Sequence, residues 1–139
     1  MMYDFSRFYA AQNYSYATAL AEIRCGRKQS HWMWYVFPQL QGLGRSDMSQ
    51  YYALADVREA MAYLEDPVLG PRLKEISGAL LDLPGDSARA VMGSPDDMKL
   101  RSCMTLFALA DPYCAVFRQV LDKYFGGKDD PRTLRLLGL

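Results

Sequence analysis

The chain has 139 residues, of which 50% are hydrophobic and 23% are charged, and its formal net charge at pH 7 is zero. This profile is typical of a folded protein and excludes a disordered one, so we expect one domain over residues 1–139 without a linker. Zero net charge gives no overall attraction to nucleic acid or to an anionic membrane, and nucleic-acid binding is the least favoured function.

Apolar residues at helical spacing, with capping residues between them, predict many short helices. Asn13 is expected to end the first helix and Gly26 the second. Asp56 interrupts the helical pattern of residues 49–64, where it can cap a new helix. In chain order the expected helices cover residues 5–13, 14–25, 32–37, 49–64, 67–83, 87–92, 95–110, 116–124 and 132–137.

The clearest helix start is Ser94-Pro95-Asp96-Asp97, which offers a capping hydroxyl, a proline in the first position and two carboxylates near the positive helix end. Asp130-Pro131 repeats the cap and the proline. No segment shows a convincing strand alternation or a hairpin turn. The sequence therefore predicts a compact all-α protein of about six to nine short helices.

The longest apolar run is far shorter than the ~20 residues that cross a bilayer, and the N-terminus lacks the pattern of a signal peptide. We therefore expect a cytoplasmic protein that does not enter membranes. Cys25, Cys103 and Cys114 are far apart and accompany a single histidine, which disfavours a zinc site, so no metal and no cofactor is expected. Buried free thiols are favoured over a reactive cysteine.

The most unusual segment is residues 30–46, which holds the only histidine and both tryptophans. Large apolar residues run without interruption from Trp32 to Phe37. The spacing of apolar residues alone does not show whether this run is a strand or a helix. Ser30 as N-cap and Pro38 as terminator favour a buried helical turn. We expect these aromatic rings to belong to the hydrophobic core and not to form a stacking surface for a ligand, although one ring could also line a pocket.

Between Ile23 and Ser46 the chain carries four basic residues and no acidic one. Guanidinium groups, indole rings and small residues together suit an anionic, ring-containing ligand. His31 is the natural general acid or base, and its alternative role is a histidine bonded to nearby backbone. Residues 42–45 are a weak phosphate-loop signal, and a helix-terminal turn with solvated cations is favoured over it.

A second polar cluster follows the helix start at Asp96 and Asp97, whose carboxylates are explained by helix capping. Nothing comparable explains the cations and hydroxyl of residues 99–102. If this helix packs beside the His31 segment, the two clusters form one mixed polar pocket. The candidate catalytic residues are His31, Lys99 and Asp97. The candidate ligand-binding residues are Lys28, Ser30, His31, Trp34, Arg45, Ser46, Lys99, Arg101 and Ser102.

Specific motifs recur along nearly the whole chain, among them Ser30-His31-Trp32-Met33-Trp34 and Gly42-Leu43-Gly44-Arg45-Ser46. Through these motifs the chain resembles domain-of-unknown-function family 1810, a family of small bacterial proteins. The resemblance implies an all-helical, orthogonally packed bundle and supplies no activity. Members of that family often carry the label calpastatin, but resemblance to calpastatin would imply a disordered inhibitor, which this composition does not fit.

Three function classes remain open. The first is a binding or hydrolytic domain for a phosphorylated or nucleotide-like ligand, with His31, Asp97, Lys99 and Arg101 as polar contributors. A faint similarity in the Lys-x-x-x-x-Met…Phe spacing to helical hydrolases of ADP-ribose-type linkages is too weak to assign roles. The alternative is a non-enzymatic protein–protein interaction adaptor, and the third class is nucleic-acid binding. We expect a monomer or a weak homodimer.

Overall fold

Nine helices joined by loops make up residues 3–139, the part of the chain that this computed structural model describes. Within these residues the only β-type pairing is an isolated bridge between Leu40 and Leu54. The all-α prediction is therefore confirmed. The helices are α1 Ser6–Arg24, α2 Met33–Val36, α3 Asp47–Tyr51, α4 Val57–Glu65, α5 Leu69–Leu81, α6 Ala88–Met92, α7 Asp96–Ala110, α8 Ala115–Phe125 and α9 Pro131–Leu136.

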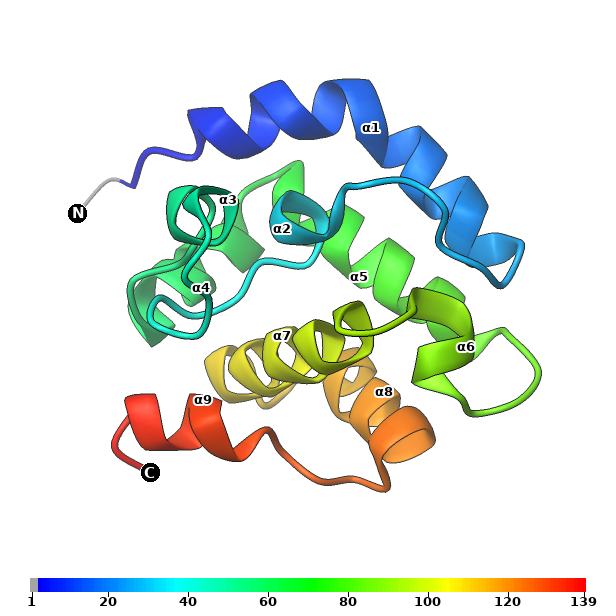
Figure 1. Ribbon diagram of the computed structural model, residues 1–139. Coiled ribbons are helices and arrows are strands. Elements are labelled where there is room, and N and C mark those ends of the chain that lie inside the picture. Colours follow the sequence, from blue (N-terminus) through cyan, green and yellow to red (C-terminus); the bar gives the residue numbers. More distant parts are fainter. Residues whose placement is uncertain (1–2) are drawn as a thin grey trace.

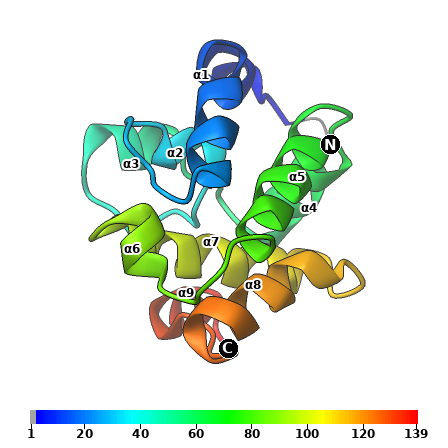
Figure 2. The same cartoon turned by 90° about the vertical axis from the view of Figure 1, so that its right-hand side faces the viewer.

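The helix α7 lies at the centre of the bundle and contacts α4, α6, α8 and α9 (Figure 1). The long helix α1 packs against α2 and α5, on the side of the molecule opposite to α9. Figure 2 shows that α1 and α5 stand upright in that view while α7 and α8 lie across them, which is an orthogonal arrangement. The short helices α2 and α3 and the loops around them lie between α1 and α7 in Figure 1.

The core is built from aromatic and aliphatic side chains that come from almost every helix. The apolar stripe predicted on α7, Leu100, Cys103, Met104 and Phe107, is fully buried. Burying each large apolar side chain contributes about 1.5–3 kcal/mol, so this packing is the main source of stability. The largest side chains of the core include Phe8, Trp32, Phe37, Tyr63, Phe107 and Phe117.

Three helix starts were predicted correctly, and at two of them, Asp56 and Asp130, the sequence also predicted the cap. Asp56, Ser87 and Asp130 each accept a hydrogen bond from the backbone N–H three residues later, at the starts of α4, α6 and α9. The predicted cap at Ser94 is wrong, because the chain enters α7 through Pro95 with no side-chain cap.

The predicted break near Asn13 is also wrong, because α1 continues through it to Arg24. Asn13 is exposed on the outer face of the helix, while Phe8, Gln12 and Ile23 keep one buried face along its whole length. Packing of that face against α2 and α5 overrides the weak helix propensity of asparagine.

No helix in residues 3–139 is long and apolar enough to cross a membrane. Over the same range, no three His, Cys, Asp or Glu side chains gather in a way that could hold a metal ion.

Candidate functional site

Glu22, in the last turns of α1, holds the loop that leads into α2. Its carboxylate accepts hydrogen bonds from the backbone N–H groups of Gln29 (2.7 Å) and Ser30 (2.9 Å), and also from the Ser30 hydroxyl (2.5 Å). The indole N–H of Trp32 donates to the same carboxylate at 2.9 Å. Ser30 therefore does not cap α2, which corrects the sequence-based assignment: its hydroxyl is engaged by a residue eight positions earlier.

The carboxyl of Glu22 makes this loop sensitive to acid. Burial raises the pKa of Glu22, but hydrogen bonds from Ser30, Gln29 and Trp32 outweigh burial and lower the pKa from 4.5 to about 2. A carboxyl whose pKa is lower in the folded state stabilises the fold above pH 4.5 and loses that contribution as the pH falls towards 2.

We expect Glu22→Gln to lower the free energy of unfolding at pH 7 by about 1–3 kcal/mol, because hydrogen bonds to a charged acceptor are lost. The difference between wild type and variant should shrink as the pH falls below 4.5. Urea unfolding at several pH values measures both. An equal difference at pH 7 and pH 3 would contradict the role given to Glu22.

Two lysines share the carboxylate of Asp96 in the first turn of α7. The Nζ of Lys28 lies 3.0 Å from Oδ2, and the Nζ of Lys99 lies 3.4 Å from Oδ1. Only 8% of the Lys28 side chain is exposed, and its ammonium also donates to the carbonyl of Ser30 at 2.5 Å. The buried Lys28 is thus held by a carboxylate and a carbonyl oxygen.

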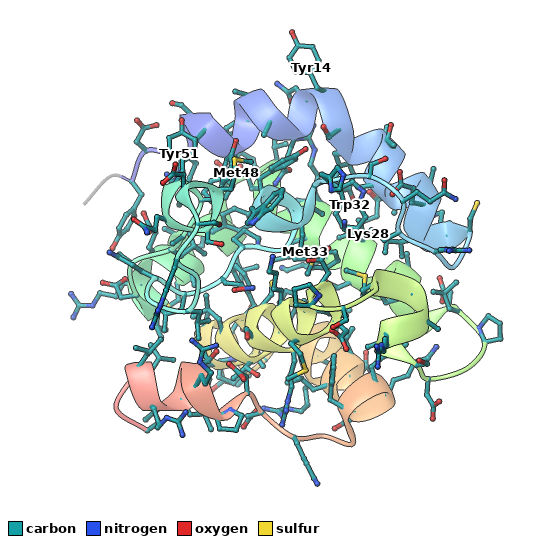
Figure 3. The ribbon with its side chains drawn as sticks, in the orientation of Figure 1. Tyr14, Lys28, Trp32, Met33, Met48 and Tyr51 are labelled. Atoms are coloured by element: carbon teal, nitrogen blue, oxygen red, sulfur yellow. The ribbon has the colours of Figure 1, made fainter. Side chains whose placement is uncertain are left out.

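Each of these lysines also lies over a tryptophan ring. The Nζ of Lys28 is 4.9 Å from the ring centroid of Trp32, and that of Lys99 is 5.2 Å from the ring centroid of Trp34. Lys28 and Trp32 lie between α1 and α7 in Figure 3. The start of α7 and the tryptophan segment are therefore adjacent in space. The sequence did not predict this contact; it predicted only that a shared pocket would form if the two segments met.

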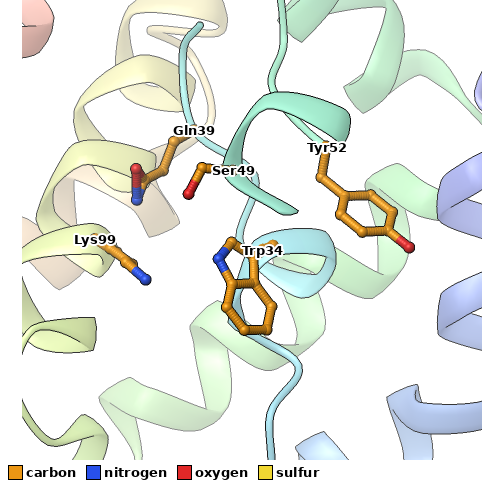
Figure 4. Close-up of a pocket in the computed structure, with 5 residues that line it drawn as sticks. All are labelled: Trp34, Gln39, Ser49, Tyr52 and Lys99. Carbon is orange, nitrogen blue, oxygen red and sulfur yellow. The ribbon is translucent and has the colours of Figure 1, made fainter. Parts of the chain in front are cut away.

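A small pocket opens beside the exposed side of this lysine cluster (Figure 4). We call it the tryptophan notch; it is lined by Trp34, Gln39, Ser49, Tyr52 and Lys99. In Figure 4 the indole nitrogen, the Lys99 ammonium, the Gln39 amide and the Ser49 hydroxyl converge, whereas the Tyr52 hydroxyl points away. Its free volume is about 10 Å³, enough for about one water molecule.

The notch presents several hydrogen-bond donors, and one of them lacks a protein acceptor. The Nε1 of Trp34 is buried and has no partner among the described residues. Indole and ammonium groups only donate. The hydroxyl of Ser49 accepts from Ser46 at 2.8 Å, so its own hydrogen is free to be donated. Within residues 3–139, the ion pair of Lys99 is with Asp96, at 3.4 Å. This donor set suits an oxyanion.

Comparison with known proteins gives the chain a family. The family described as "Protein of unknown function (DUF1810)" matches residues 2–137. The chain belongs to the DUF1810 family. A solved structure, the conserved hypothetical protein Rv1873 from Mycobacterium tuberculosis, is 46% identical in sequence and covers 96% of each chain with a TM-score of 0.94. Comparison with curated proteins found no match.

The match to the DUF1810 family confirms the resemblance based on the motifs, and the near-complete overlap with the solved structure supports the helical bundle described above. Neither the family description nor the name of the solved protein gives a reaction, a ligand or a partner.

In the DUF1810 chain, the turn at residues 42–45, which we call the glycine turn, packs against α3, the helix that carries Ser49 of the notch. A Cβ on Gly44 would lie 2.4 Å from Cβ of Ser49, so only glycine lets the turn pass the first turn of α3. The hydroxyl of Ser46 accepts from the backbone N–H of Ser49 and caps α3. Ser46, a predicted ligand residue, therefore positions Ser49 and does not itself line the notch.

Arg101 and Ser102 lie elsewhere and fasten the loop before α9. Arg101 donates to the carbonyls of Lys128 (3.1 Å) and Asp129 (2.7 Å). Ser102 donates to the carboxylate of Asp130 at 3.0 Å. The structure thus does not bring these two candidate ligand residues to the notch.

The remaining candidates also lie outside the notch lining. His31 and Arg45 are exposed, and no hydrogen bond or ion pair among residues 3–139 involves either of their side chains. The carboxylate of Asp97 accepts from the backbone N–H of Met98 at 2.9 Å, as expected for a residue near a helix start. Trp34 and Lys99 are the two predicted residues that the notch contains.

Sequence reasoning missed several residues of the site. Gln39 belongs to the Phe37-Pro38-Gln39 motif, which was a usable signal. Tyr52 belongs to another such motif, Tyr52-Ala53, whereas Ser49 has no local signal, because tertiary packing brings α3 to Trp34. Glu22 was missed because its partners follow it by seven to ten residues across a loop, a spacing that no helix rule predicts.

Proposed function

We propose that this protein binds a small anionic ligand, of phosphate or nucleotide type, with an oxyanion in the tryptophan notch. The observation that carries the proposal is the buried indole N–H of Trp34, which has no protein acceptor and faces the same space as the Lys99 ammonium. A buried donor without an acceptor costs about 1–3 kcal/mol. An anionic acceptor would remove that cost when it binds.

The two lysines support this proposal in different ways. Lys28 is nearly buried and stays with Asp96, so it holds that carboxylate at the start of α7. Lys99 is 26% exposed and its 3.4 Å contact with Asp96 is longer, so its flexible stem can turn the ammonium towards a ligand. Movement of Lys99 would also enlarge a notch that now has room for about one water.

Hydrolysis of the ligand has less support than binding. General acid–base catalysis needs a group within hydrogen-bond reach of the proton it transfers. His31, the side chain suited to that role, does not line the notch. The proposal is therefore a binding function.

An adaptor role also has less support. Large apolar side chains are exposed on several different elements, for example Tyr14 on α1 (92% exposed) and Tyr113 before α8 (99% exposed). Singly exposed apolar residues occur on most protein surfaces and need no partner.

A thermal-shift series tests the proposal. Inorganic phosphate, AMP and acidic metabolites are added to the wild type at constant ionic strength. A ligand at about 100 times its Kd should add about 2.7 kcal/mol of stability. We expect Trp34→Phe, which keeps a ring but removes the N–H, to weaken binding at least about tenfold, since a charge-assisted hydrogen bond is worth about 1.5–3 kcal/mol.

Lys99→Gln should weaken binding to a similar degree, because it removes the cation of the notch. Lys74→Gln is the matched control: it removes the same charge from an exposed position on α5. The proposal is wrong if no anion stabilises the wild type, or if Trp34→Phe and Lys99→Gln respond to the ligand as the wild type and the Lys74→Gln control do.

A further inference from the structure

A second concavity lies where the glycine turn meets the C-terminal helix. It is lined by Gly42, Arg132, Arg135 and Leu136, has a volume of about 200 Å³ and shares no lining residue with the tryptophan notch. We call it the arginine cleft. Figure 1 shows the segment before α3 above α9 at the left of the molecule, although the two are about ninety residues apart in sequence.

The walls of the arginine cleft are fixed by direct contacts. One Nη of Arg132 donates to the carbonyl of Leu43 at 3.0 Å, and its other N–H groups have no acceptor among residues 3–139. Gly42 has φ +99°, and a Cβ there would lie 3.4 Å from Cδ2 of Leu136. The turn therefore rests on α9, and glycine both permits its backbone conformation and allows that close approach.

The charges around the arginine cleft are unbalanced. Arg132 and Arg135 are three residues apart on α9 and so share one side of the helix. Residues 131–139 contain no Asp or Glu, and residues 41–47 contain Arg45 and a single acid, Asp47. None of these three arginines takes part in an ion pair within residues 3–139.

We propose that the arginine cleft binds a phosphate group, with the guanidinium groups of Arg132 and Arg135 as its ligands. Guanidinium is planar, always charged and matches phosphate oxygens in pairs. Arg132 is already oriented by Leu43, which lowers the entropy lost on binding. The backbone N–H of Gly42, which has no acceptor among the described residues, is a further donor at the edge of the cleft.

The experiment is an NMR titration of the full ¹⁵N-labelled chain with inorganic phosphate, with chloride adjusted to keep the ionic strength constant. We expect the Gly42 amide resonance to shift and to saturate. Arg135→Gln should weaken this response at least tenfold and Arg135→Lys by a smaller factor, because lysine keeps the charge but loses the paired donors. Arg135 is the better test residue, since Arg132 also holds the turn.

Arg89→Gln on α6 is the matched control, because it removes the same charge from an exposed position outside the cleft and should change the response less than twofold. Trp34→Phe should also leave the Gly42 response unchanged, which separates this inference from the proposed function of the notch. Repeating the titration with AMP and with glucose 6-phosphate distinguishes a nucleotide source of the phosphate from a sugar source.

Three results would overturn the proposal. The first is a Gly42 response that does not saturate with phosphate. The second is an equal response in wild type and Arg135→Gln. The third is loss of the response in Trp34→Phe, which would show that the signal comes from the notch.

Discussion

Asp96→Ala is expected to lower the free energy of unfolding by about 2–4 kcal/mol. The substitution leaves the ammonium of Lys28, with 8% of its side chain exposed, without its carboxylate. Removing one partner of a largely buried ion pair is strongly destabilising, because the remaining charge stays out of water. Urea unfolding followed by circular dichroism measures the change.

The matched control is Asp97→Ala, in the same helical turn. Within the described part of the chain, the Asp97 carboxylate is hydrogen-bonded only to the backbone N–H of the next residue. Its loss should therefore cost less than about 1 kcal/mol, the size of a helix-end effect. Equal losses for the two variants would show that Asp96 acts only as a helix-end charge, and the account of the lysine cluster would then fail.

Gly70→Ala is expected to cost about 3 kcal/mol or more. Gly70 is buried in the first turn of α5, where that helix leaves α4. A Cβ at this position would lie 2.0 Å from the carbonyl oxygen of Leu64 and 2.8 Å from its carbon. Both atoms are backbone, so no side-chain rotation relieves the clash and the two helices have to separate.

Gly78→Ala on the same helix is the control for Gly70→Ala. A Cβ on Gly78 would meet no atom within 4 Å, and alanine is the better helix former. We therefore expect this variant to be as stable as the wild type or more stable by up to about 1 kcal/mol. Thermal unfolding of both variants decides: similar melting temperatures would contradict the close approach of α4 and α5.

The parts of the fold that follow from neighbouring residues could be predicted from the sequence. Asp56, Ser87 and Asp130 cap helices through bonds to residues three positions later, which is a local rule. The apolar stripe of α7 follows from helical spacing. Asn13 and Ser30 were misread because distant partners decide them: α5 packs on one helix face, and Glu22 takes up the Ser30 hydroxyl.

In the candidate site, too, local features could be predicted from the sequence and contacts between distant segments could not. The periodicity of α7 placed Lys99 beside the apolar stripe, and the rarity of tryptophan drew attention to Trp34. The same periodicity could not tell which flank of the stripe faces the tryptophan segment. Lys99 and Arg101, two residues apart, point to different sides of the helix. Lys99 reaches the notch, whereas Arg101 binds the loop before α9.

We propose that the indole N–H of Trp34 donates to a bound anion, and the NMR resonance of this N–H tests the proposal most directly. The chain has two tryptophans, so a ¹H–¹⁵N spectrum contains two indole signals, which Trp34→Phe assigns. On titration with AMP or inorganic phosphate, the Trp34 signal should shift and saturate. The Trp32 signal should stay, because that N–H already donates to Glu22. A Trp34 signal that does not move with any anion would contradict the account.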